Sequence, residues 1–222
     1  MVIIKLELFL MLIKNMFNDS WNIEVEDSIK NISIYCAPKY DCYKIMYSHN
    51  SLKQHNSIYN LDLSSRESNF VRQKPVPNYD YSLYTTERQY APSHDGTMVP
   101  MSIVYRNDMF NKDGTNKLYL YGYGSYGHTV NPTFMSTIIP LLDRGFVYVI
   151  SHVRGGSFLG FKWYEDGKME KKINTFHDFN SCAVYLIQEK YTFDKGITIE
   201  GRSAGGLLVG AAMTMRDRKS VV

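Results

Sequence analysis

The sequence predicts an α/β fold class in which a short all-β part precedes a parallel sheet with helices on both faces. Two observations predict this arrangement. Short runs of alternating polar and apolar residues, separated by Asn, Ser, Asp and Pro, fill residues 1–80. From residue 117 onward, β-branched runs alternate with helical periodicity in the order β-α-β-α-β-turn-α, which favours a doubly wound parallel sheet.

The first part of the chain is predicted to form a small sheet. The runs 31–35, 43–48 and 57–63 have the length and composition of strands. Their spacing is typical of one blade of a β-propeller, or a little more, or of an ordinary sheet, and one blade alone cannot bury both of its faces. Residues 74–78, Lys-Pro-Val-Pro-Asn, then predict a linker or a crossing strand.

The second part is predicted to begin with a hairpin. Strands over 86–92 and 98–105 flank Asp95-Gly96, a pair that accepts the positive φ values of a tight turn. Further along the chain, apolar runs predict strands and 3.6-residue periodicity predicts helices. The strands are expected over 117–123, 145–152 and 196–200, and the helices over 134–144 and 175–191, the second helix capped by Asn174 or Thr175.

The most informative segment is Gly201-Arg202-Ser203-Ala204-Gly205-Gly206, between the strand 196–200 and a predicted helix that starts at Ala204. A Gly-x-Ser-x-Gly turn from strand to helix is the nucleophile elbow of the α/β-hydrolases. There the Ser203 hydroxyl attacks a carbonyl, and the Ala204 N–H at the helix N-terminus faces the developing oxyanion. The alternative interpretation is that the small residues only let helix and strand pack closely.

The acid and base of a hydrolase triad are not found in this chain. In this fold the triad runs Ser, then Asp or Glu, then His, but all six histidines precede Ser203. His152, at a strand end, is interpreted as a hydrogen-bonding residue of the sheet edge, and Asp217, the only side-chain carboxylate after Ser203, as part of a helix end. Arg154 and the pair Glu165-Asp166 lie in loops near strand ends, where α/β proteins form ligand sites, and a solvated ion pair explains them equally well. Asp178 is expected near a helix N-terminus.

Composition excludes several classes of protein. A net charge of +3 with 44% hydrophobic residues indicates a globular domain and argues against a nucleic-acid partner. The apolar residues 1–14 are broken by Lys5 and Glu7 and are too short to span a bilayer, so we expect an edge strand or helix there and no membrane partner. No motif indicates a metal or an organic cofactor. The three cysteines lack metal-ligand spacing and indicate free thiols in the cytoplasm: Cys36, Cys42 and Cys182.

Eight short blocks of distinctive sequence occur in order along the chain, among them Tyr-Thr-Thr-Glu-Arg-Gln-Tyr at 84–90 and Tyr-Gly-Tyr-Gly-Ser-Tyr-Gly at 121–127. The others are 95–97, 142–148, 152–156, 163–168, 174–176 and 201–206. Together, over about residues 34–215, they closely resemble the prolyl oligopeptidase family, and within it the oligopeptidase B or protease II branch. Ser157 and Phe158 depart from the family, which usually has Gly and Glu there.

The resemblance implies an α/β-hydrolase domain capped by a seven-bladed propeller. Residues 1–80 would be the C-terminal remnant of that propeller, and residues 81–222 the N-terminal half of the catalytic domain. Ser203 matches the family's nucleophile, and Tyr123 matches the tyrosine whose hydroxyl completes the oxyanion hole with the Ala204 N–H. The resemblance thus implies an endopeptidase that cleaves short peptides, after Lys or Arg, through an acyl-enzyme.

Because the family's acid and base lie downstream of the nucleophile, this chain alone is expected to be inactive. Two alternatives remain open. The chain is either a non-catalytic fragment, from a degraded or split reading frame, that needs a complementing C-terminal chain, or it belongs to an acyl-peptide hydrolase or esterase of the same fold.

Overall fold

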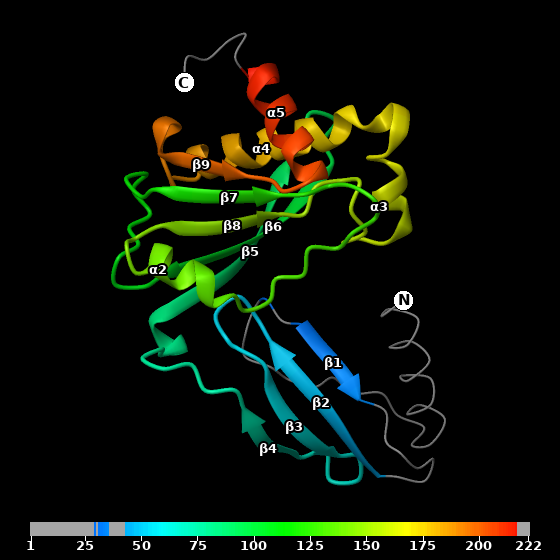
Figure 1. Cartoon of the computed structure of the whole chain (residues 1–222), viewed down its shortest axis with the longest axis vertical. Coiled ribbons are helices and arrows are strands. Elements are labelled where there is room, and N and C mark those ends of the chain that lie inside the picture. Colours follow the sequence, from blue (N-terminus) through cyan, green and yellow to red (C-terminus); the bar gives the residue numbers. More distant parts are fainter. Residues whose placement is uncertain (1–28, 30, 36–42, 217–222) are drawn as a thin grey trace.

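The computed structural model describes residue 29, residues 31–35 and residues 43–216, which form two sheets joined by a short linker (Figure 1). Predictions for residues 1–14, Cys36, Cys42 and Asp217 lie outside the described residues. Within the described ranges, no helix has both the length and the apolar character needed to cross a bilayer.

The first sheet is an antiparallel meander in the order β1-β2-β3-β4. Its strands are β1 (Asn31–Tyr35), β2 (Lys44–Asn50), β3 (Ser57–Asp62) and β4 (Ser68–Gln73). The first three strands confirm the sequence prediction, whereas β4 was not predicted. Five of the six β4 residues are exposed, so the strand lacks the apolar alternation that marks a half-buried strand. The boundary at residue 80 and the assignment of this sheet to a propeller remain predictions.

The linker leads from β4 into the second sheet. Residues 74–80 contain no strand, which leaves the linker interpretation in place of a crossing strand. The 3-10 turn η1 (Tyr81–Leu83) then leads into the predicted hairpin, β5 (Tyr84–Pro92) and β6 (Met98–Arg106). At its turn Gly96 has a φ of +79°, and its N–H donates to the Ser93 carbonyl (3.0 Å).

The second sheet has the strand order β5-β6-β8-β7-β9. The strands β7 (Leu118–Gly122), β8 (Val147–Ser151) and β9 (Ile197–Glu200) run parallel, as the β-α-β pattern predicted, and the hairpin adds two antiparallel strands at one edge. Because β7, β8 and β9 are parallel, their carboxyl ends meet at one edge of the sheet, which is where α/β proteins place their ligands.

Helices cover both faces of this second sheet (Figure 1). Residues alternate along β8, so Val147 and Val149 pack in the cluster that contains α4 and α5 residues, while Tyr148 and Ile150 pack with Leu142 of α2 on the other face. The helices are α2 (Ile139–Leu142), α3 (Phe161–Glu165), α4 (Ile173–Gln188) and α5 (Ala204–Arg216), with 3-10 turns η2 (Ser136–Ile138), η3 (Met169–Lys171) and η4 (Asp194–Gly196). The doubly wound arrangement is confirmed.

Two helix predictions need correction. The helix expected over 134–144 is confined to η2 and α2. Asn174 and Thr175 do not cap α4, which already begins at Ile173 without a side-chain cap. The Thr175 hydroxyl instead donates to the carbonyls of Arg154 (2.8 Å) and Gly167 (3.1 Å), so tertiary hydrogen bonds replace the local cap.

Candidate active site

The predicted elbow is a sharp turn between β9 and α5, with Ser203 at its tip. Ser203 is exposed and has a φ of +52°, a left-handed conformation that non-glycine residues adopt rarely. Glycine is required on either side of it. A Cβ on Gly201 would meet the Gly205 carbonyl oxygen at 2.0 Å, and a Cβ on Gly205 would meet the Gly122 oxygen at 2.8 Å. The strand–turn–helix geometry is therefore present, while the nucleophilic role of Ser203 remains a prediction.

Ala204 begins α5, directly after Ser203. The N–H groups of a helix's first turn have no intrahelical acceptor, because the residues four positions earlier lie outside the helix. At this turn the Gly205 N–H donates to the Arg202 carbonyl (2.8 Å) and the Gly206 N–H to the Ser203 carbonyl (2.9 Å). The Ala204 N–H therefore belongs to the helix end that stabilises negative charge.

Tyr123 follows β7, the strand that pairs with β9. Its Cδ2 lies 3.6 Å from the position that a Cβ on Gly205 would occupy, so the half-buried ring packs beside the elbow. The ring also meets His128 edge-on, with centroids 5.3 Å apart. The structure thus brings Tyr123, Ser203 and Ala204 to the carboxyl edge of the parallel strands, as an oxyanion hole requires, although the role of Tyr123 itself remains a prediction.

Close backbone packing supports the loop that carries Tyr123. Gly124 has a φ of +64°, and a Cβ there would meet Cγ2 of Thr175 at 2.3 Å. A Cβ on Gly155 would meet the Gly124 oxygen at 2.2 Å. The Lys172 Nζ donates to the Gly124 carbonyl and, at 2.8 Å, to the Ser125 hydroxyl, and burial lowers the pKa of Lys172. The contacts of Gly124 with Thr175, Gly155 and Lys172 therefore restrict the conformation of the loop directly after Tyr123.

Arg154, after β8, corrects the expectation of a solvated ion pair. Its side chain is 5% exposed and forms two parallel hydrogen bonds with the fully buried Asp178, Nε to Oδ2 (2.9 Å) and Nη2 to Oδ1 (2.7 Å). Its Nη1 donates to Asp95 (2.6 Å), and this contact holds the pKa of Asp95 well below its usual range. The Ser93 hydroxyl donates to Asp178 (2.6 Å). The network joins the hairpin turn, the end of β8 and α4. The sequence analysis considered Arg154 and Asp178 separately and did not predict that they meet.

His152 follows β8 and forms a side-chain hydrogen bond, as predicted, but it is buried, which corrects the expectation of a position at the sheet edge. Its Nε2 lies 2.6 Å from the Ser102 hydroxyl, and its ring stacks on Phe158 at 3.7 Å. Burial lowers the pKa of His152 well below its ordinary value. Phe158, a departure from the family pattern, also receives the Arg88 guanidinium 4.9 Å above its ring, so its apolar face is used in packing.

No general base is placed at the elbow by the residues that the structure describes. Over residues 43–216, the Ser203 hydroxyl forms no hydrogen bond with a histidine or a carboxylate. In the same residues, no group of three His, Cys, Asp or Glu side chains is arranged to hold a metal ion.

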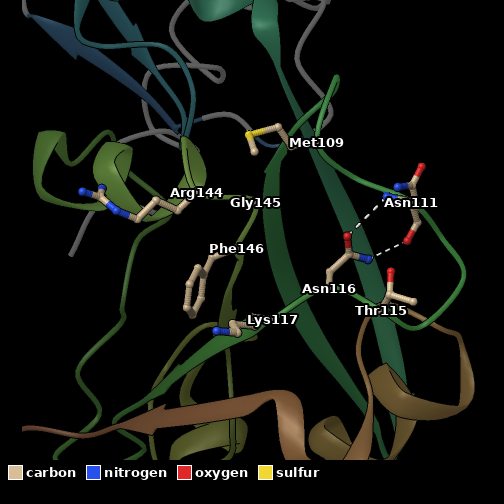
Figure 2. Close-up of a pocket in the computed structure, with 8 residues that line it drawn as sticks. All are labelled: Met109, Asn111, Thr115, Asn116, Lys117, Arg144, Gly145 and Phe146. Atoms are coloured by element: carbon tan, nitrogen blue, oxygen red, sulfur yellow. Dashed lines mark hydrogen bonds between the residues drawn. The ribbon is translucent and has the colours of Figure 1, made fainter.

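A pocket of about 420 Å³ is lined by residues of the loops before β7 and β8 (Figure 2). Lys117 precedes β7, and Gly145 and Phe146 precede β8, so the pocket lies at the amino edge of the parallel strands, opposite the elbow. Figure 2 shows the two hydrogen bonds that join Asn111 and Asn116 in its wall. This pocket therefore has no part in chemistry at Ser203.

Comparisons with known proteins show that the chain is similar to part of several peptidases. Residues 132–219 match the model of the prolyl oligopeptidase family. The chain is 39% identical over 198 residues to dipeptidyl aminopeptidase BI of Pseudoxanthomonas mexicana, covering 89% of this chain and 27% of that protein. It is 38% identical over 194 residues to protease 2 of Moraxella lacunata, covering 87% and 28%. The chain thus spans about a quarter of the length of these relatives.

Solved structures give the same result. Oligopeptidase B from Leishmania major matches with a TM-score of 0.77 at 36% identity, over 87% of this chain and 27% of that one. Oligopeptidase B from Trypanosoma brucei, solved with covalently bound antipain, matches with a TM-score of 0.77 at 38% identity, over 87% and 28%. These matches confirm the predicted fold class, in which an all-β part precedes part of an α/β-hydrolase sheet.

Proposed function

This chain belongs to the prolyl oligopeptidase family, and we propose that it carries the acyl-transfer residues of a serine peptidase that cleaves short peptides. One observation carries the proposal. Ser203 stands at the tip of a glycine-locked turn with a φ of +52°, at the edge of the sheet where the three parallel strands end. Strained backbone at an exposed serine is characteristic of a nucleophile elbow.

In the proposed mechanism the Ser203 Oγ attacks the carbonyl carbon of the scissile peptide bond. The oxyanion of the tetrahedral intermediate accepts hydrogen bonds from the Ala204 N–H and the Tyr123 hydroxyl. Expulsion of the amine leaves an acyl-enzyme on Ser203, which water then hydrolyses. A general base must take the serine proton and return it to the amine, and no described histidine is bonded to Ser203.

We propose further that the 222 residues by themselves have little peptidase activity. Loss of any triad member costs several orders of magnitude in rate, since the hydroxyl alone is a weak nucleophile. Specificity for Lys or Arg before the cleaved bond is proposed from similarity to the oligopeptidase B branch. Cleavage of acyl-peptides or esters is the alternative for the same fold.

A second candidate function is that of one half of a two-chain enzyme. The strand β9 is last in the order β5-β6-β8-β7-β9 and pairs only with β7 among the described residues. Next to it, Leu207 and Met213 of α5 are 59% and 60% exposed. An open parallel edge beside apolar side chains favours the addition of further strands. The proposed partner is a complementing C-terminal chain that supplies acid and base, in the cytoplasm, with no cofactor.

Labelling with a fluorophosphonate probe tests both proposals. We expect no Ser203-dependent labelling of the chain alone. After co-expression with the C-terminal segment of the Moraxella protease 2, we expect labelling that Ser203→Ala abolishes. The control is Ser136→Ala, at an exposed serine distant in sequence from the elbow, which should leave the labelling unchanged. In that pair Tyr123→Phe should slow hydrolysis of a Lys or Arg amide about 100- to 1,000-fold.

The outcomes separate the proposals. Efficient Ser203-dependent labelling of the chain alone would contradict the proposed inactivity. Labelling of the co-expressed pair that survives Ser203→Ala would contradict the nucleophile. A soluble, stable pair that neither labels nor hydrolyses any amide or ester would contradict peptidase function altogether.

A further inference from the structure

Lys172 stands where a cation is locally unfavourable. It is the N-cap residue of α4, and no side chain caps that helix end. The N-terminus of a helix carries a positive partial charge, so Asp, Asn or Ser is favoured there and a cation is repelled. The Lys172 side chain is also half-buried, and burial penalises an ammonium group that has no carboxylate beside it. Burial lowers its pKa, and no neighbouring carboxylate raises that pKa again.

The preceding residue, Lys171, shows the contrast with an ordinary surface lysine. Its side chain is 60% exposed, and its Nζ lies 2.8 Å from Oδ1 of Asp166, which raises its pKa. Lys172 forms no ion pair in the part of the chain that the structure describes. The Phe176 ring, 5.9 Å from its Nζ, lies near the outer limit of a cation–π contact. A residue that breaks local rules in this way is expected at functional or strained sites.

The Lys172 ammonium is used in the loop that follows Tyr123. It donates to the Gly124 carbonyl and, at 2.8 Å, to the Ser125 hydroxyl. Gly124 has a φ of +64°, and a glycine has more backbone freedom than any other residue. An ammonium bound to its carbonyl fixes the orientation of that peptide group, so Lys172 removes freedom at the position next to Tyr123.

Tyr123 depends on such support because its own tip is not held. Among the described residues, its hydroxyl forms no hydrogen bond. The ring is positioned by packing beside Gly205 and by an edge-on contact with His128. A donor in an oxyanion hole must be held to within about 0.5 Å of its working position. The position of the Tyr123 hydroxyl is therefore set by its backbone and by what fixes that backbone.

We propose that Lys172 is a positioning residue for Tyr123: its ammonium holds the Gly124–Ser125 segment so that the Tyr123 hydroxyl stays beside the elbow. Lys172 touches no substrate and acts through Tyr123. The catalytic part of this inference rests on the proposed function, in which Tyr123 is an oxyanion donor, whereas the restraint on the loop does not. The restraint explains why an unfavourable cation stands at the start of α4.

Fluorine NMR of the full chain tests whether Lys172 fixes Tyr123. With 3-fluorotyrosine in place of tyrosine, the Tyr123 signal is the one that Tyr123→Phe removes. We expect one sharp Tyr123 signal when Lys172 is present and a broadened or split signal in Lys172→Met, because the loop then samples several conformations. The matched variant Lys171→Met removes an exposed ammonium one position earlier and should leave the signal unchanged.

A double-mutant cycle in the co-expressed pair tests whether this restraint matters to the reaction. Lys172→Met should lower kcat for a Lys or Arg amide about 10- to 100-fold with KM unchanged, because a displaced donor is missed in the transition state. In the Tyr123→Phe background the same change should cost at most about threefold, since no hydroxyl remains to be positioned. A purely structural defect would cost the same factor in both backgrounds.

Circular dichroism shows whether the variants fold. If Lys172→Met does not, Lys172→Gln, which is neutral and shorter, replaces it in both experiments. An unchanged Tyr123 signal, or equal losses of kcat with and without the Tyr123 hydroxyl, would overturn the proposal. Full kcat in Tyr123→Phe would instead overturn the oxyanion role of Tyr123, and the fluorine signal would still decide whether Lys172 restrains the loop.

Discussion

The two sheets of this protein differ in how they are buried. In the second sheet all five residues of β8 are buried, and helices cover both faces. In the first sheet five of the six residues of β4 are exposed. Among the residues that the structure describes, the buried apolar cluster of the first sheet consists of four: Ile45, Tyr47, Leu61 and Leu63. The second sheet therefore has a core of its own, while the first is a thin layer that gains stability from what packs against it.

The two sheets also differ in how deeply their ion pairs are buried. Arg154 and Asp178 are buried together in the second sheet region, with side chains 5% and 0% exposed. In the first sheet the ion pair Lys44–Asp62 is long, at 3.9 Å, and Lys44 is 72% exposed. Removing one partner of a buried ion pair is strongly destabilising, because the other charge stays buried without compensation. Charges on the first sheet stay in contact with water, so their ion pair contributes little to the free energy of unfolding.

The largest effect is expected from Arg154→Met. The substitution leaves the buried Asp178 carboxylate without its cation, and the free energy of unfolding should fall by about 3–5 kcal/mol. Urea denaturation followed by circular dichroism measures it. The control is Arg106→Met, which removes the outer ion pairs with Asp108 and Asp143 and should cost much less than Arg154→Met, because water solvates the carboxylates that remain. Equal losses for the two variants would show that burial does not distinguish them.

Core truncation should have the next largest effect. Leu120→Ala, in the middle of β7 and fully buried, should cost about 2–5 kcal/mol, because the surrounding cluster cannot collapse into the cavity. Leu61→Ala in the first sheet removes an equally buried side chain, but its small cluster can relax, so the loss should lie near the lower end of that range. A larger loss at Leu61 in the same urea experiment would reverse the comparison of the two cores.

A pH effect of intermediate size is expected from His152. Burial lowers its folded pKa, so the unfolded chain binds a proton first as the pH falls below about 6.5, and stability declines from there downward. His152→Gln should flatten this part of the pH–stability curve, measured as urea midpoints between pH 7.5 and 5. His55→Gln should flatten it less, since His55 is less deeply buried. If the pH–stability curve of His152→Gln declines as steeply as that of the unmodified chain, the loss of stability below pH 6.5 does not come from His152.

The smallest effect is expected at the surface of the first sheet. Phe70 on β4 is 59% exposed and meets Tyr59 edge-on at 5.7 Å, so Phe70→Ala should cost about 0.5–1 kcal/mol. Phe179→Ala in α4, where the ring is 1% exposed, should cost about 3–5 kcal/mol. Thermal melts of the two variants test the difference, and similar melting temperatures would contradict it.

Much of the second sheet could be predicted because its local signals agree with its fold. The strands β7, β8 and β9 are apolar runs separated by helices or turns, and parallel pairing follows from that order. The prediction missed β4 because its side chains face water and show no alternation. It misplaced the start of α4 because Thr175 is a good local cap whose hydroxyl bonds to a distant carbonyl instead.

The candidate site also contains residues that the sequence predicts and residues that it does not. The elbow residues are contiguous, so a single motif predicts Ser203 and Ala204, and resemblance to a family added Tyr123. The Arg154–Asp178–Asp95 network was missed, since its members are far apart in sequence and each is common on protein surfaces.

By itself, the sequence determined the fold class, the order along the chain of the parallel strands β7, β8 and β9 and of the helices α4 and α5, and the turn that presents Ser203. These follow from hydrophobic periodicity and from glycines whose conformational freedom is local. Only the tertiary structure decided which distant groups meet: Tyr123 beside Gly205, Arg154 on Asp178, and the linker against the segment before α2. Such contacts depend on how strands pair and layers pack, and no short stretch of sequence specifies them.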